Sequence, residues 1–126
     1  MLSTGEKTAI ELKTQVLHGR KIAYRTGGEG PKVLLIHGIT GDSDAWVSVL
    51  HRLAGTGHEV IAPDMPGAGA SERQRGDHSL GAHASMLRDL LTAIDREPVT
   101  LVGHSLGGGM AMQFSYQFPE LVERLV

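Results

Sequence analysis

The chain has 126 residues, of which 40% are hydrophobic and 21% are charged, and this composition is that of one soluble globular domain. The formal net charge is −2, and lysines and arginines are scattered among acidic residues, which argues against a basic surface for nucleic acid or an anionic membrane. There are no cysteines, so disulfides, thiolate metal sites and thiol nucleophiles are excluded.

The start of the chain lacks the features of a targeting segment. Residues 1–14 include several charged side chains and no apolar stretch of the kind found in signal peptides. No apolar run elsewhere in the sequence is long enough to span a bilayer. We therefore expect a cytoplasmic protein that is not inserted in a membrane.

Two segments near the start alternate apolar and polar residues, as half-buried antiparallel strands do. They are residues 8–12 and 21–25, and His18-Gly19 lies between them as a turn. The pattern predicts an antiparallel hairpin, which the glycine-rich segment 27–31 closes.

Three later segments are continuous runs of apolar residues, which is typical of strands that are covered on both faces. These runs are 33–36, 60–62 and 99–102. Such strands belong to parallel sheets, so we expect the three to pair with one another.

The segments after these runs have apolar residues at helical spacing. The predicted helices cover residues 46–53, 80–94 and 106–114, with Asp42 or Ser43 as the first N-cap and Pro119 ending the last. Alternating strands and helices predict an α/β fold with three α/β/α layers, a mostly parallel sheet and the N-terminal antiparallel hairpin. In such folds, ligand chemistry gathers at the carboxyl ends of the strands.

Residues 103–107, Gly-His-Ser-Leu-Gly, have the G-x-S-x-G form between a predicted strand and a predicted helix. The form alone is a weak signal, but this setting is the one that a nucleophile elbow requires. A sharp turn pushes the serine side chain out of the sheet, so residues two places away must be small, as Gly103 and Gly107 are. The backbone N–H of Leu106, at the positive end of the helix, is suited to stabilise an oxyanion beside Ser105.

Three motifs follow the three buried strands in order: His37-Gly38-Ile39, the segment 64–71 (Asp-Met-Pro-Gly-Ala-Gly-Ala-Ser) and the segment 103–108. Together they resemble the serine α/β-hydrolases, and the resemblance runs from the hairpin to the last residue. It implies a partial α/β-hydrolase fold with Ser105 as nucleophile. It also implies that the N–H groups of Ile39 and Leu106 form the oxyanion hole and that segment 64–71 is mainly structural.

Histidines flank the proposed nucleophile, but the resemblance assigns His37 and His104, like Gly38, to shaping the site rather than to the general base. The other histidines lack the spacing of metal ligands, so we expect them on the solvated surface: His18, His51, His58, His78 and His83. We expect no metal. The segment 67–69 lacks the third glycine of a dinucleotide motif, and no phosphate-loop motif exists, so we expect no cofactor.

The catalytic triad is incomplete in this chain. The family order is serine, then an acid, then a histidine, whereas only Glu120 and Glu123 and no histidine follow Ser105. Residues 123–126 resemble the start of the family's sixth strand. We therefore expect residues 1–126 to be the N-terminal part of a single α/β-hydrolase domain, nearly inactive in isolation because the base is missing.

For the intact relative, the resemblance implies transfer of an acyl group to water from a small-molecule ester or another carbonyl substrate. Serine rather than aspartate at the elbow points away from the epoxide hydrolases and haloalkane dehalogenases that share the scaffold. The alternative is a non-catalytic binding module or pseudoenzyme in which Ser105 only lines a pocket, and a third possibility is a non-functional remnant. The substrate, the cap and the oligomeric state stay open.

Overall fold

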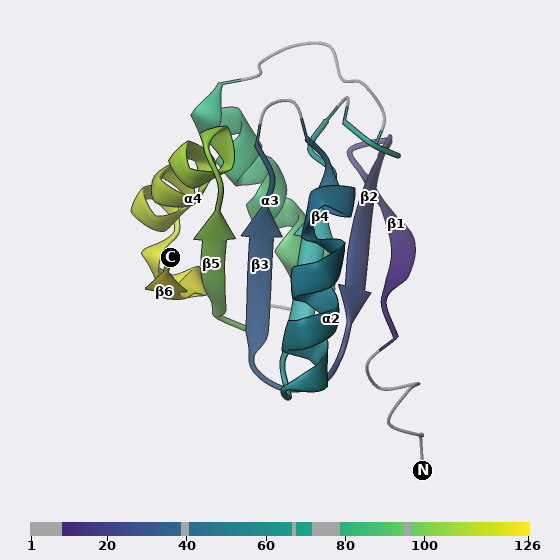
Figure 1. The fold of residues 1–126 in the computed structure, drawn as a ribbon. Helices are drawn as coiled ribbons and strands as arrows, with labels where there is room; N and C mark the ends of the chain where they lie inside the picture. The colour runs from purple at the N-terminus through teal and green to yellow at the C-terminus, as the bar shows by residue number, and fades with distance from the viewer. Residues whose placement is uncertain (1–8, 39–40, 67, 72–78, 95–96) are drawn as a thin grey trace.

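The computed structural model describes residues 9–38, 41–66, 68–71, 79–94 and 97–126. Its strands and helices follow one another along the chain as shown in Figure 1. They are β1 (Glu11–Leu17), β2 (Arg20–Gly27), β3 (Lys32–Ile36), η1 (Ser43–Trp46), α2 (Val47–Gly55), β4 (Glu59–Pro63), α3 (Leu80–Ile94), β5 (Val99–Gly103), α4 (Leu106–Gln117), η2 (Pro119–Leu121) and β6 (Val122–Leu125). The predicted alternation of strand and helix after the hairpin is confirmed.

The six strands of the described residues form one sheet in the order β1-β2-β4-β3-β5-β6 (Figure 1). The pairs β1–β2 and β2–β4 are antiparallel, whereas β4–β3, β3–β5 and β5–β6 are parallel. The prediction of a mostly parallel sheet with an antiparallel hairpin is confirmed. Because β3, β4 and β5 run in the same direction, their last residues meet at one end of the sheet, which we call the carboxyl end, opposite the amino end.

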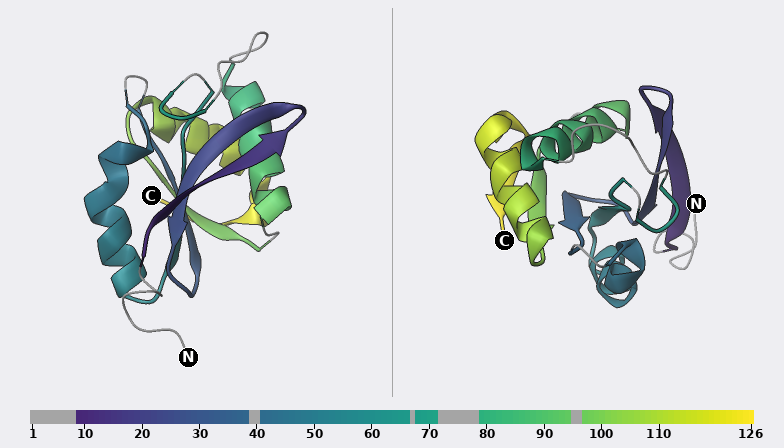
Figure 2. Two further views of the ribbon diagram at one scale, coloured as in Figure 1. Left: turned by 90° about the vertical axis from the view of Figure 1, so that its right-hand side faces the viewer. Right: turned by 90° about the horizontal axis from the view of Figure 1, so that it is seen from above.

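Helices cover both faces of this sheet, α2 on one face and α3 with α4 on the other (Figure 2). Successive side chains of a strand point to opposite faces, and both faces of β3 are covered, so residues 33–36 are all apolar. Its residues Val33 and Leu35 pack in the core on the side of α2. Leu34 and Ile36 pack in the core with α3 and α4. The three-layer arrangement is therefore as predicted.

The N-terminal hairpin has the predicted turn but a different first strand. Leu17 pairs with Arg20, and His18 and Gly19 between them have φ values of 51° and 79°, as a type I′ turn requires. The prediction of a strand at 8–12 was wrong in its limits, since β1 begins at Glu11 and continues to the turn. β1 is an edge strand whose side chains are exposed except near its end, so burial leaves little alternation in its sequence.

Two connecting segments differ from the sequence prediction. Segment 27–31 does not close the hairpin, because Gly27 ends β2 and the following residues lead into β3. The first predicted helix is split into the short η1 and α2, and the carboxylate of Asp42 caps η1 by accepting a hydrogen bond from Asp44 N–H at 2.8 Å.

Within the described ranges, every helix is too short or too polar to cross a membrane.

Candidate active site

Ser105 occupies the sharp turn between β5 and α4 at the carboxyl end of the sheet. Its backbone has φ 59° and ψ −121°, a conformation that costs energy for a residue with a Cβ atom. The serine is solvent-exposed. The local structure thus holds Ser105 at the surface in a strained backbone conformation, as the sequence pattern predicts.

The glycines on either side of Ser105 allow three backbone segments to approach closely. A Cβ atom on Gly103 would collide with the carbonyl oxygen of Gly107 and lie 2.7 Å from Gly108 Cα. A Cβ atom on Gly107 would collide with the carbonyl oxygen of Ile36 and lie 2.6 Å from that of His37. The turn therefore needs glycine at both positions, because any side chain would push α4 away from β5 and β3.

Leu106 is the first residue of α4, so the helix itself offers no acceptor to its N–H group. The next two N–H groups of the turn are already bonded, from Gly107 to the His104 carbonyl and from Gly108 to the Ser105 carbonyl, both at 2.9 Å. The positive end of the helix lies at Ser105, its N-cap residue. Ile39, the other predicted oxyanion donor, lies outside the described residues.

The imidazole of His37 is buried, and both of its nitrogens are engaged. Nδ1 donates a hydrogen bond to the Gly38 carbonyl at 2.6 Å, and Nε2 accepts one from Met65 N–H at 3.0 Å. The ring therefore carries its proton on Nδ1 and joins the end of β3 to the segment after β4. With neither nitrogen left over, His37 holds local structure and has no lone pair to offer Ser105 as a base.

Asp64 holds the segment after β4 through hydrogen bonds to backbone N–H groups. Its buried carboxylate accepts from Ser43 N–H at 2.7 Å and from Ala70 N–H at 3.0 Å. The hydroxyl of Ser71 donates to the Asp64 carbonyl at 2.6 Å and accepts from Ala23 N–H at 2.8 Å. The structural role expected for this segment fits these contacts, in which both carboxylate oxygens of Asp64 accept main-chain hydrogen bonds.

A cavity of about 230 Å³ lies beside the Ser105 turn. Its lining residues are His37, Gly38, Ala45, Trp46 and His104. A Cβ atom on Gly38 would lie 3.5 Å from Ser105 Cβ, which places this wall of the cavity against the serine. Sequence reasoning missed Ala45 and Trp46 as site residues, because the spacing of apolar residues assigned Trp46 to the buried face of a helix.

The remaining histidines do not form a metal site in the described part of the chain. No group of three or more His, Asp or Glu residues there is arranged to hold a metal ion. His18 and His51 are exposed as predicted, and His18 contacts Asp89 at 2.9 Å. His83 differs from the surface prediction, since both of its ring nitrogens are shielded from solvent. His78 lies outside the described residues.

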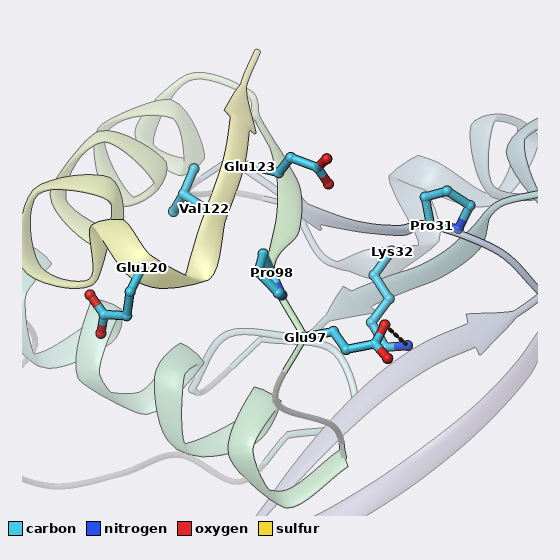
Figure 3. Close-up of a pocket in the computed structure, with 7 residues that line it drawn as sticks. All are labelled: Pro31, Lys32, Glu97, Pro98, Glu120, Val122 and Glu123. Atoms are coloured by element: carbon cyan, nitrogen blue, oxygen red, sulfur yellow. Dashed lines mark ion pairs between the residues drawn. The ribbon is translucent and has the colours of Figure 1, made fainter.

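A second cavity, of about 490 Å³, lies at the amino end of the sheet (Figure 3). Lys32, which is only 8% exposed, lines it and forms ion pairs with Glu59 at 2.7 Å and Glu97 at 3.6 Å. Glu120 and Glu123 also line this cavity. The two acidic residues that follow Ser105 in the sequence therefore lie at the opposite end of the sheet from it.

The chain belongs to the α/β-hydrolase fold family, whose sequence profile matches residues 31–126. It is 52% identical over 115 residues to an uncharacterised protein of Mycobacterium tuberculosis (strain ATCC 25618 / H37Rv), covering 91% of this chain and 33% of that protein. It is 33% identical over 118 residues to a soluble epoxide hydrolase of Corynebacterium sp. (strain C12), covering 94% of this chain and 41% of the enzyme.

The solved structures agree with this assignment. The crystal structure of a putative lipase from Acinetobacter baumannii AYE superimposes with a TM-score of 0.87 at 33% identity, covering 97% of this chain and 42% of the lipase. The chain thus spans about a third to two fifths of the length of these proteins. The family and the fold are those that the three motifs predict.

Proposed function

We propose that residues 1–126 carry the nucleophile of a serine hydrolase, which transfers an acyl group from a small-molecule substrate to water. The observation that carries this proposal is the backbone of Ser105, with φ 59° at the N-terminus of α4. Strain of this kind is kept where the surrounding structure enforces it, often at active sites. The close contacts of Gly103 and Gly107 supply that enforcement.

In the proposed reaction, Ser105 Oγ attacks the carbonyl carbon of the substrate while a histidine takes the hydroxyl proton. The carbonyl oxygen becomes an oxyanion, which the N–H groups of Leu106 and Ile39 stabilise. The intermediate collapses, and the leaving group departs with the proton from the histidine. Water then attacks the acyl-serine by the same steps, which regenerates the hydroxyl and releases the acid.

The family resemblance assigns His104 to shaping the site, so we propose that the histidine and the acid of the triad are other residues. His37 has both nitrogens engaged, and Glu120 and Glu123 lie at the amino end. We therefore propose that residues 1–126 form the N-terminal part of one α/β-hydrolase domain, with the base and acid on later loops. The relatives support this division, since the chain matches only 33% and 41% of their lengths.

The substrate class follows from the nucleophile. One relative is named as an epoxide hydrolase and one solved neighbour as a putative lipase. Family resemblance implies that epoxide hydrolases attack with a carboxylate, whereas position 105 is a serine here. We therefore propose an ester or another activated carbonyl compound as the substrate, and no cofactor, since the proposed steps need only a nucleophile, a base and oxyanion donors.

A fluorophosphonate probe tests the nucleophile directly, because it reacts with activated serines and leaves a stable adduct. We expect stoichiometric labelling of the full-length gene product, detected by intact mass, and loss of labelling in Ser105→Ala. Ser48→Ala is the matched control, since Ser48 is exposed on α2 and should leave labelling unchanged. A folded full-length protein that stays unlabelled, or labelling that survives in Ser105→Ala, would contradict the proposal.

The second candidate is a binding module of the same fold in which Ser105 does not react. The position of Glu120 and Glu123 favours it, since this chain places neither acid near the serine. The labelling experiment separates the two candidates. A binding module predicts a folded protein that binds small molecules beside Ser105 and gives no covalent adduct.

A further inference from the structure

The segment that follows Gly38 starts against the proposed nucleophile. A Cβ atom on Gly38 would lie 3.5 Å from Ser105 Cβ. The Gly38 carbonyl accepts a hydrogen bond from His37 Nδ1 at 2.6 Å, which fixes this first end of the segment. The next residue, Ile39, supplies the second proposed oxyanion donor through its N–H group and lies outside the described residues. An oxyanion donor works only within a narrow range of positions, so the chain on both sides of Ile39 must be held.

The other end of the segment is η1, and Arg25 of β2 holds it by two hydrogen bonds. Nε of Arg25 donates to Ser43 Oγ at 3.1 Å, and Nη2 donates to the Asp44 carboxylate at 3.3 Å. Ser43 is buried, so its hydroxyl has no bulk water to replace this donor if Arg25 is lost. η1 has only four residues, and a helix this short depends on contacts with the rest of the protein.

The backbone of Arg25 is a fixed base for these hydrogen bonds. β2 lies between β1 and β4 in the sheet (Figure 1), and Arg25 pairs with Leu12 on one side and with Ala62 on the other. The planar guanidinium presents Nε and Nη2 in fixed relative positions, so it can hold two acceptors at once. A lysine ammonium at the same place would be a single charge on a flexible stem.

We infer that Arg25 is a positioning residue of the proposed hydrolase: it holds η1, and through η1 the segment that carries the Ile39 N–H group, in place beside Ser105. This role rests on the proposed function, because it requires that Ser105 reacts and that the Ile39 N–H stabilises the oxyanion. Because the Asp44 side chain is 75% exposed, its ion pair with Arg25 adds little stability, and the main contribution of Arg25 is the position that it gives to η1.

The rate of fluorophosphonate labelling of the full-length protein, measured against probe concentration, tests this role. We expect Arg25→Met to lower the maximal labelling rate about tenfold. This is less than the loss of about 10²- to 10³-fold when an oxyanion donor is removed, because here the donor is displaced and not removed. The probe concentration that gives half of the maximal rate should not change, since the donor acts mainly on the transition state. Arg52→Met is the matched control, because it makes the same substitution on the exposed surface of α2 and should label as the wild type does.

Ser43→Ala removes the hydroxyl that accepts from Arg25 Nε, and it tests the same contact if Arg25→Met does not fold. It should also lower the maximal rate, and the double variant should be no slower than Arg25→Met, because both substitutions act through one contact. Urea denaturation of each variant identifies the conditions in which it is folded. A wild-type labelling rate in folded Arg25→Met or Ser43→Ala, or effects that multiply in the double variant, would overturn the inference. A folded wild type that stays unlabelled would instead overturn the proposed function, and the role of Arg25 with it.

Discussion

The two ends of the sheet use different means to hold the same strands together. At the carboxyl end, β3, β5 and α4 approach so closely that Gly103 and Gly107 have no room for a Cβ atom. At the amino end, a buried ion pair is added to the main-chain pairing of β3 with β4, and the Lys32 ammonium lies 2.7 Å from Glu59. Ser105 therefore sits where geometry is fixed by main-chain contacts.

This difference bears on the chemistry proposed for the carboxyl end. Main-chain contacts leave few alternative positions, whereas the Lys32 ammonium reaches its partners through several rotatable bonds. A reacting hydroxyl and its oxyanion donors must stay within a few tenths of an ångström of their working positions. We expect substitutions at the carboxyl end to be costly, and those at the amino end to be tolerated.

The largest effect is expected for Gly107→Ala. The added methyl group would collide with the Ile36 carbonyl oxygen, so α4 must move or the turn must open. We expect a loss in the free energy of unfolding on the order of 4 kcal/mol, measured by urea denaturation. Gly108→Ala is the matched control, since its Cβ would find its nearest neighbour at 3.6 Å, and it should gain about 0.5 to 1 kcal/mol from the lower entropy of its unfolded chain. Equal stability in the two variants would remove the main-chain explanation of the turn.

Asp64→Ala tests a buried charge on which the carboxyl end also depends. The substitution removes the acceptor of the Ser43 and Ala70 N–H groups. We expect a loss of about 3 kcal/mol in the same denaturation experiment, because hydrogen bonds to a charged group contribute about 1.5 to 3 kcal/mol each and some are regained with water. Asp64→Asn keeps one oxygen acceptor and should lose less. A loss as large in Asn as in Ala would mean that the charge, not the hydrogen bonds, holds the segment.

The smallest effect is expected at the amino end, for Lys32→Met. Methionine keeps most of the buried apolar stem, while the ion pairs with Glu59 and Glu97 are lost. The side chain of Glu59 is 28% exposed and that of Glu97 is 71% exposed, so both carboxylates can hydrate and we expect a loss of about 1 kcal/mol. Probe labelling of Ser105 should not change. Slower labelling in a stable Lys32→Met protein would show that the two ends are coupled.

Much of the fold could be predicted because each buried strand and each helix has a strong local pattern. The apolar runs located β3, β4 and β5, and the helical spacing gave the limits of α3 as residues 80–94. The first strand was misplaced because β1 lies at the edge of the sheet, where Leu12 is 49% and Val16 59% exposed. Only Leu17 of β1 is buried, so burial imposes little alternation on this strand and its sequence carries little information on its limits.

The candidate site was predictable where it depends on the main chain and not where it depends on contacts between distant segments. The strand, the helix and two glycines around Ser105 are adjacent in sequence, so the sharp turn followed from them. The cavity needs η1 to meet the β5–α4 turn, and no pattern within either segment indicates that meeting. The engagement of both His37 nitrogens is likewise a long-range contact, with Met65. The chemical role of Ser105 stays a prediction.

The position of β3 in the middle of the sheet has a consequence for synthesis of the chain. β3 emerges early, yet its neighbours on the two sides, β4 and β5, begin at residues 59 and 99. During translation the N–H and C=O groups along its two edges stay unpaired until first one neighbour and then the other is made, and sheets built from distant pairings form slowly. The nascent chain is therefore most exposed to association with other chains before residue 103 has left the ribosome, and slowing translation before β5 should increase that exposure.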